Sequence, residues 1–209
     1  MRIVLFVEGH TERKAIPSFF KRWLDSKVEP RVGLKVVRFD GWPELVKDSP
    51  TKAKMYLQKE DVIAVVALLD LYGCKIYPHH LQGNAVACYD WAKNELETKV
   101  NHSRFRHFFA VYETEAWLLS NPDIFPPAIK NALPDKVQNP EEVDFDEPPS
   151  KLLDSLYRAK TGRSYKKVTY GKDLFDKLDP HIAYSKCPRL KELLDELVKI
   201  AQGATHEER

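Results

Sequence analysis

The chain has 209 residues, of which 43% are hydrophobic and 31% are charged, and its formal net charge is +2. This composition excludes a generally disordered protein, because it can supply a buried core. It also excludes a membrane-spanning helix, since no apolar run approaches about 20 residues. With so small a net charge, any anionic partner must be bound by a local basic patch.

The cysteines and histidines indicate no disulfide scaffold and no zinc site. Cys74, Cys88 and Cys187 are odd in number and widely spaced, so we expect reduced thiols. His79 and His80 fit no standard zinc spacing, and we expect them in a surface loop. The N-terminus has no basic and apolar signal region, which predicts a cytoplasmic protein.

The first element is an apolar strand that stops on a carboxylate. Residues 4–7 lead into Glu8, Gly9 permits a tight turn, and Thr11 is placed to cap the helix that follows. Apolar residues at three- and four-residue spacing predict that helix over residues 12–26. In an open α/β sheet, ligands bind outside the carboxyl ends of the strands, where Glu8 lies and where Glu12 also faces.

The next elements continue the alternation of strand and helix. Residues 33–39 are β-branched and partly alternating, which predicts a strand near a sheet edge. A helix is expected over residues 43–58, and Pro50 leaves open whether it is one helix or is broken into two. Residues 62–69 form the most hydrophobic run and predict a strand buried on both faces, which ends on Asp70.

A helix over residues 85–100 and a strand over residues 105–112 follow, and then a helix that starts on Glu113 and Glu115. Parallel neighbours need crossovers of about a dozen residues, and the helical segments supply them. Residues 1–120 are therefore predicted to form an α/β domain whose parallel sheet carries helices on both faces.

Beyond residue 120 the sequence becomes rich in proline and acidic residues. We expect an irregular connection with short helices up to about residue 149, helices over residues 150–160 and 186–201, and a frayed tail from Gln202. Residues 121–209 are thus predicted to be a mainly helical C-terminal extension.

The carboxylates at the strand ends suggest a metal site. In a parallel sheet Glu8, Asp70 and Glu113 emerge at one edge, with Glu12 and Glu115 within a turn of them. Such a cluster repels itself unless a cation is present, and oxygen-only ligands suit Mg²⁺ or Mn²⁺. The implied reaction is metal-assisted phosphodiester cleavage. The alternative is that each acid only stabilises the first turn of the following helix.

These residues resemble a known family. The run Val7-Glu8-Gly9-His10-Thr11-Glu12, followed some sixty positions later by a strand ending in Asp70, is similar to the Toprim fold of topoisomerases, primases and overcoming-lysogenisation-defect nucleases. Small stand-alone Toprim-like proteins of bacterial defence and mobile-element loci, a domain-of-unknown-function family, also share the motif that here is Glu113 to Leu119. The resemblance extends more loosely to the helix start at residues 187–190.

The resemblance implies a role for each matching residue. Glu8 would be a metal-linked general acid/base, Asp70 a metal ligand, and Glu12, Glu113 and Glu115 ligands of a second metal. One position departs from the family pattern of Asp-x-Asp, because Tyr72 stands at the second aspartate. A neutral phenol is a poor Mg²⁺ ligand, so one metal site is weakened, rebuilt from Glu113, or lost.

A dense basic segment covers residues 158–172. Its cations and interleaved tyrosines suit a phosphate backbone and stacked bases, and the candidate contacts are Arg158, Lys160, Arg163, Lys166 and Lys167. Lys172 is a candidate to neutralise charge on a scissile phosphate. A solvated loop between helices is the alternative.

These patterns favour a Mg²⁺- or Mn²⁺-dependent nuclease acting on DNA or RNA. A non-catalytic nucleic-acid-binding or regulatory subunit, with an ATPase partner in a defence complex, is the main alternative, and the missing second aspartate favours it. A phosphate-transfer enzyme acting on small nucleotides is a third.

Overall fold

The computed structural model describes residues 1–141 and 147–207, with backbone only for residues 205–207. Four strands form one all-parallel sheet in the order β2-β1-β3-β4. Their bounds are Arg2–Val7 for β1, Gly33–Arg38 for β2, Val62–Asp70 for β3 and Phe105–Ala110 for β4. The predicted α/β class is confirmed, with β2 at an edge and β3 in the interior.

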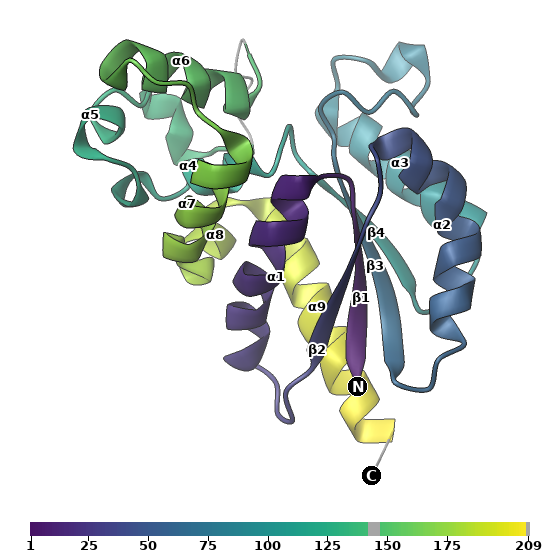
Figure 1. The fold of residues 1–209 in the computed structure, drawn as a ribbon. Coiled ribbons are helices and arrows are strands. Elements are labelled where there is room, and N and C mark those ends of the chain that lie inside the picture. The colour runs from purple at the N-terminus through teal and green to yellow at the C-terminus, as the bar shows by residue number, and fades with distance from the viewer. Residues whose placement is uncertain (142–146, 208–209) are drawn as a thin grey trace.

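Helices cover both faces of the sheet, as Figure 1 shows. On one face lie α1 (His10–Asp25) and α9 (Pro188–Glu207), and on the other lie α2 (Trp42–Leu57) and α3 (Ala85–Val100). Successive side chains of β1 point to opposite faces, so that Ile3 packs with the α1 side and Val4 with the α2 side. The two faces therefore carry separate hydrophobic clusters.

The helix expected over residues 43–58 is confirmed, and the open question at Pro50 is answered, because α2 runs through this proline as one helix. Proline removes one helical hydrogen bond, but Leu45, Ala53 and Leu57 on the same helix are buried against the sheet on either side of it. Burial of that apolar face outweighs the missing bond. The predicted fraying from Gln202 is wrong, since α9 continues to Glu207.

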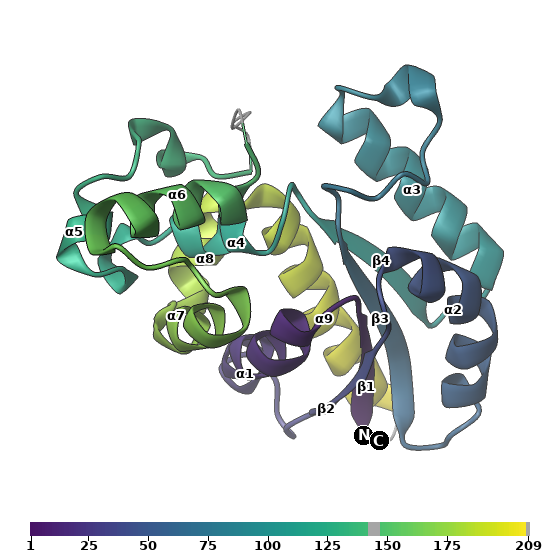
Figure 2. The same cartoon turned by 45° about the horizontal axis from the view of Figure 1, so that its top comes forward.

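The segment after β4 forms a layer of short helices beside α1 (Figure 2). They are α4 (Glu115–Leu119), α5 (Pro127–Lys130), α6 (Pro149–Thr161), α7 (Lys172–Lys177) and α8 (Pro180–Lys186). The predicted irregular connection with short helices is confirmed where it is described, and residues 142–146 lie outside the described part. The boundary proposed near residue 120 stays a prediction.

Other predictions from composition can be compared directly with the structure. Cys74, Cys88 and Cys187 are free and buried, as predicted for reduced thiols. His79 and His80 lie exposed in a short 3-10 turn, His79–Leu81. Among the described residues, no helix is both long enough and apolar enough to cross a membrane.

Candidate metal centre

Acidic residues gather where the parallel strands end. Glu8 follows β1, Asp70 is the last residue of β3, and Glu113 lies just beyond β4. Asp70 is paired in register with the last residue of β4, and its Oδ1 accepts a 3.0 Å hydrogen bond from the backbone N–H of Thr114. This bond connects the end of β3 to the turn that carries the other acids.

Three of these carboxylates form an acidic triad: Asp70, Glu113 and Glu115. Each contributes an oxygen that lies within 4.8 Å of the corresponding oxygens of the other two. Glu113 is 7% exposed and Glu115 is 1% exposed, whereas Asp70 keeps partial contact with solvent. Buried carboxylates at such separations need a cation or protons, because their mutual repulsion is poorly screened.

Lys167 supplies a cation to the triad from within the chain. Its Nζ lies 2.9 Å from Glu113 Oε1, to which it donates a hydrogen bond, and 3.2 Å from Glu115 Oε2. Glu113 is also held by Ser150, whose backbone N–H donates to Oε2 at 2.9 Å and whose hydroxyl donates to Oε1 at 3.0 Å.

The triad strongly perturbs its own pKa values. Burial raises the pKa of Asp70 well above its usual value, and Glu12 adds to the increase while Lys167 opposes it. Burial likewise raises the pKa of Glu115 to about 7, again against Lys167. Burial alone would lower the pKa of the Lys167 ammonium, but Glu115, Asp70 and Glu113 outweigh it and raise the pKa.

The triad fits a hard divalent cation. Its ligands are all oxygens, which suit Mg²⁺ or Mn²⁺. Glu115 is nearly fully buried, and its Oε2 lies 3.2 Å from the Lys167 ammonium, whereas its Oε1 has no hydrogen-bond partner among the described residues. Buried polar atoms are nearly always hydrogen-bonded, so Oε1 could accept a further ligand such as a cation.

Glu8 and Glu12 lie near the triad but outside its closest group. Burial raises the pKa of Glu8, and the charge of Glu12 adds to this effect while the backbone N–H of Trp42 opposes it. Glu12 also raises the pKa of both Asp70 and Glu115. All five predicted metal-site residues therefore share one electrostatic neighbourhood, and three of them contribute the closely spaced oxygens.

The turn between β1 and α1 differs from the sequence prediction. Helix α1 starts at His10 with Gly9 as its cap, so Thr11 lies inside the first turn and does not cap the helix. Gly9 has an extended backbone, with φ of −129°, which any residue can adopt. Glycine fits here because a Cβ would overlap Glu12 Oε2, so the missing side chain leaves room for that carboxylate.

The predicted basic segment divides into two groups of side chains. Arg158, Lys160, Arg163 and Lys166 are exposed, and Arg158 pairs with Asp154 one turn earlier in α6. Lys167 begins a π-helical turn, Lys167–Gly171, that directs its ammonium to the triad. The phosphate contacts remain a prediction.

The tyrosines of this segment do not form an open stacking surface. Tyr165 is buried and packs against Tyr157 and Tyr170, with ring centroids 5.5 and 6.2 Å apart. These ring contacts pack Tyr165 and Tyr170 against α6, which carries Tyr157.

Lys172 lies away from the triad. Its Nζ is 2.6 Å from Asp176 Oδ2, one turn along α7, and about half of its side chain is exposed. The lysine that contacts the acids is Lys167, which the sequence placed among the nucleic-acid contacts. Ser150 was not predicted at all, and its position just after Pro148 and Pro149 at the start of α6 gave only a helix-start signal.

The structure is similar to regions of two larger proteins. Compared with the C-terminal region of the Xanthomonas campestris pv. campestris OLD protein, it has a TM-score of 0.51 and 16% identity, and the match covers 100% of this chain and 97% of that one. For the C-terminal region of the Burkholderia pseudomallei OLD protein, the TM-score is 0.48 with 18% identity, over 94% and 98% of the two chains.

No curated protein sequence matches the chain. At 16% identity, the Xanthomonas structure supports the fold alone. A family model described as Domain of unknown function (DUF4276) matches residues 7–198. Because that match covers nearly the whole chain, the protein belongs to the DUF4276 family.

Proposed function

We propose that this protein is a divalent-metal-dependent nuclease of the Toprim type, which cleaves phosphodiester bonds in DNA or RNA. The observation that carries the proposal is the acidic triad at the carboxyl edge of the parallel sheet, which includes the nearly fully buried Glu115. The similarity of the fold to the C-terminal region of an OLD protein agrees with the sequence motifs shared with overcoming-lysogenisation-defect nucleases.

Asp70, Glu113 and Glu115 would hold the cation, Mg²⁺ or Mn²⁺. When bound, such an ion polarises a phosphoryl oxygen and lowers the pKa of a coordinated water. The backbone N–H of Thr114 orients Asp70, and Ser150 orients Glu113. These hydrogen bonds fix the carboxylate positions before any ligand arrives.

Lys167, and not Lys172, is assigned the role of the cationic side chain at the scissile phosphate. Its side chain is about one third exposed and its ammonium already contacts two of the acids, so it can neutralise negative charge on both the triad and a substrate. Glu8, whose pKa is raised by burial, is assigned proton transfer, because a carboxyl that titrates closer to neutral pH is a more effective general acid/base.

Tyr72, at the position of the second family aspartate, is half exposed. In this proposal, Glu113 and Glu115 replace the missing carboxylate.

Calorimetric titration with Mn²⁺ tests the proposal, together with cleavage assays on plasmid DNA and on RNA. Asp70→Asn and Glu115→Gln keep the side-chain shapes and remove one ligand charge each, and we expect each to weaken Mn²⁺ binding by roughly ten-fold or more and to abolish cleavage. Asp123→Asn, which changes an exposed acid outside the triad, is the matched control. Wild-type affinity in both triad variants would refute the metal centre.

One observation favours a second function. Lys167 already pairs with Glu113 and Glu115, so the chain partly neutralises the triad by itself. A non-catalytic nucleic-acid-binding or regulatory subunit, working with an ATPase in a cytoplasmic defence complex, would need no more than this. Nucleic-acid binding without cleavage in either Mg²⁺ or Mn²⁺ would favour that function.

A further inference from the structure

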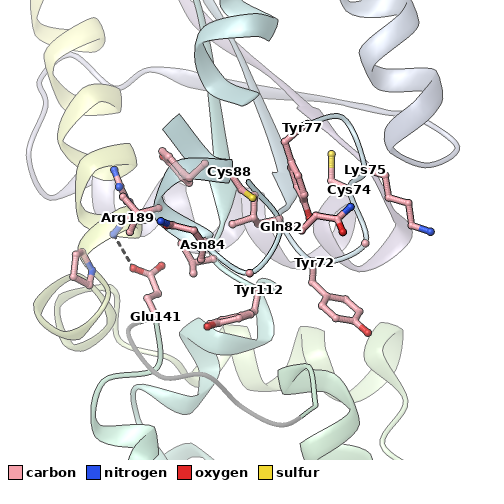
Figure 3. A pocket seen from close by; sticks show the side chains of 18 residues that line it. Tyr72, Cys74, Lys75, Tyr77, Gln82, Asn84, Cys88, Tyr112, Glu141 and Arg189 are labelled. Carbon is pink, nitrogen blue, oxygen red and sulfur yellow. Dashed lines mark hydrogen bonds between the residues drawn. The ribbon is translucent and has the colours of Figure 1, made fainter. Parts of the chain in front are cut away.

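A large pocket lies beside the triad and takes no part in the proposed metal chemistry. Its volume is about 1030 Å³, and it opens between the loop after β3, the end of β4 and the start of α9. Its lining includes Tyr72, Tyr77, Asn84, Val86, Tyr112 and Arg189. Figure 3 shows Tyr112 between Glu141 and Tyr72 in that view, with Asn84 and Gln82 above them.

The pocket and the triad are built on the same two strand ends. Tyr72 follows Asp70 by two residues, and Tyr112 directly precedes Glu113. The backbone N–H of Tyr72 donates a 2.8 Å hydrogen bond to the carbonyl of Tyr112, which holds the two tyrosines together beyond the last paired strand residues. A ligand that contacts Tyr72 or Tyr112 is therefore bound by residues that are one or two positions from a triad carboxylate in the sequence.

The backbone at Tyr112 is held in a conformation that is rare for a residue with a side chain. Its φ is 64°, in the left-handed region, which costs about 1–3 kcal/mol for residues other than glycine. Such strain persists where surrounding structure enforces it. Here the strained residue, Tyr112, lines the pocket and directly precedes the triad residue Glu113.

Some of the positions that would attract an anion are already filled from within the chain. At the start of α9, Glu141 accepts hydrogen bonds from the backbone N–H groups of Arg189 and Leu190 at 2.7 and 3.3 Å. At the start of α3, Asn84 Oδ1 accepts one from the N–H of Ala87 at 3.0 Å. These bonds occupy two N–H groups of α9 and one of α3, and the guanidinium of Arg189 pairs with Glu192, so part of what could attract an anion at this pocket is already occupied from within the chain.

The rest of the lining combines aromatic and apolar surface with amide donors and the exposed side chain of Lys75. Tyr72 is 50% exposed and Val86 is 59% exposed, although large apolar side chains are usually buried. The side-chain nitrogen of Asn84 has no hydrogen-bond partner among the described residues. Planar, neutral ligands with hydrogen-bonding edges match this surface.

We propose that the pocket binds an unpaired nucleobase, stacked on Tyr72, of a strand whose phosphate lies at the triad. The proposal rests on the proposed nuclease function and makes single-stranded nucleic acid the preferred substrate. A paired base cannot enter without leaving its stack, which costs a few kcal/mol. Stacking on an aromatic side chain tolerates any base, so the pocket should select for unpaired structure and not for sequence.

Binding without cleavage tests the pocket separately from the reaction. The probes are single-stranded oligonucleotides of DNA and of RNA carrying one fluorescent base analogue, 2-aminopurine, the same DNA as a duplex, and adenosine monophosphate. All are measured with Ca²⁺, which also takes oxygen ligands, in place of Mg²⁺ or Mn²⁺, and gel electrophoresis checks that the strands stay intact. We expect wild type to bind the single strands, with quenching of the analogue, more tightly than the duplex. Tyr72→Ala should weaken single-strand binding by roughly ten-fold, whereas Tyr72→Phe should not.

Met55→Ala is the matched control, because Met55 is 49% exposed but lies on α2, outside the pocket lining. The proposal of a base pocket would be refuted if Tyr72→Ala left single-strand binding unchanged, or if wild type bound the duplex as tightly as the single strands. Either result would refute it even if Mn²⁺-dependent cleavage is found. Base binding that depends on Tyr72, in a protein that cleaves nothing, would keep the pocket and refute the nuclease. If adenosine monophosphate binds as tightly as the oligonucleotides, the ligand of the pocket is a free nucleotide and the proposal of a bound strand is refuted.

Discussion

At the scale of single residues, Lys167 is the group on which the acidic site depends. It is 54 residues from Glu113 in the sequence, yet its ammonium contacts both Glu113 and Glu115. A buried carboxylate that loses its partner keeps the cost of its desolvation, so the loss of one cation affects several acids together.

Replacing this lysine therefore has a predicted effect on stability. Lys167→Met should lower the free energy of unfolding by about 1–3 kcal/mol, because Glu113 and Glu115 lose their cation. Added Mn²⁺ should raise the melting temperature of this variant more than that of wild type, since the ion takes over the neutralisation. Chemical denaturation and thermal melts with and without Mn²⁺ measure both effects.

Lys172→Met is the control for this comparison. Lys172 makes an exposed ion pair with Asp176, and solvent screens such pairs so that they contribute little to stability. A Lys172→Met variant as destabilised as Lys167→Met, or a Lys167→Met variant that Mn²⁺ does not stabilise further, would contradict the assignment of Lys167 to the triad.

At the scale of elements, strand β4 carries an unusual buried residue. His107 is fully buried in the middle of the strand, with its ring 4.6 Å from that of Phe109, and neither ring nitrogen has a hydrogen-bond partner among the described residues. Burial lowers the pKa of His107 to about 3, and the charge of Lys93 contributes to the same direction. The folded protein therefore keeps this imidazole neutral.

This burial predicts a pH dependence of stability. Because the folded pKa lies below the ordinary value of 6.5, the contribution of neutral His107 is complete above pH 6.5 and is lost as the pH falls from there toward 3. The loss approaches about 1.4 kcal/mol per pH unit. His107→Phe removes this term, so its free energy of unfolding should fall less steeply than that of wild type between pH 6.5 and 4.5.

Urea denaturation of both proteins across that range measures the difference. Buried carboxylates also titrate there, but they are common to the two proteins and cancel in the comparison. Parallel curves for wild type and His107→Phe would mean that His107 is accessible to protons in the folded state.

At the scale of the whole molecule, the net charge of +2 is too small to attract a nucleic acid by itself. Phosphate binding must therefore depend on a local group of basic residues. Lys160, Arg163 and Lys166 are exposed and lie near Lys167 in the sequence. We expect that changing all three to alanine weakens nucleic-acid binding and reduces the salt slope by about 0.7 log units per lost contact on a single strand. Binding measured between 50 and 200 mM salt gives this slope.

A variant that combines Lys47→Ala, Lys54→Ala and Lys59→Ala, at exposed lysines on or just after α2, removes the same three positive charges elsewhere and controls for their general loss. If the patch variant and wild type show the same salt slope, residues 158–166 do not contact phosphates and are a solvated surface.

The sequence by itself determined the α/β class, the bounds of most strands and helices, and the gathering of Glu8, Asp70 and Glu113 at one edge of the sheet. These features depend on local periodicity and on the rule that parallel strands end together, both of which a single sequence displays. It also named Glu113 and Glu115, because both follow directly on a predicted strand.

Only the tertiary structure decided which side chains complete the site. Lys167 and Ser150 reach Glu113 from the C-terminal extension, 54 and 37 residues away, and no local pattern reports such a contact. In the same way, Gly9 leaves room for Glu12 through a close approach that follows from packing and not from backbone conformation. Periodicity identifies which face of an element is buried, but the partner of a polar side chain depends on how distant segments pack. For this reason the sequence suggested Lys172 for the phosphate-neutralising role, whereas the contacts of Lys167 with Glu113 and Glu115 led us to propose Lys167.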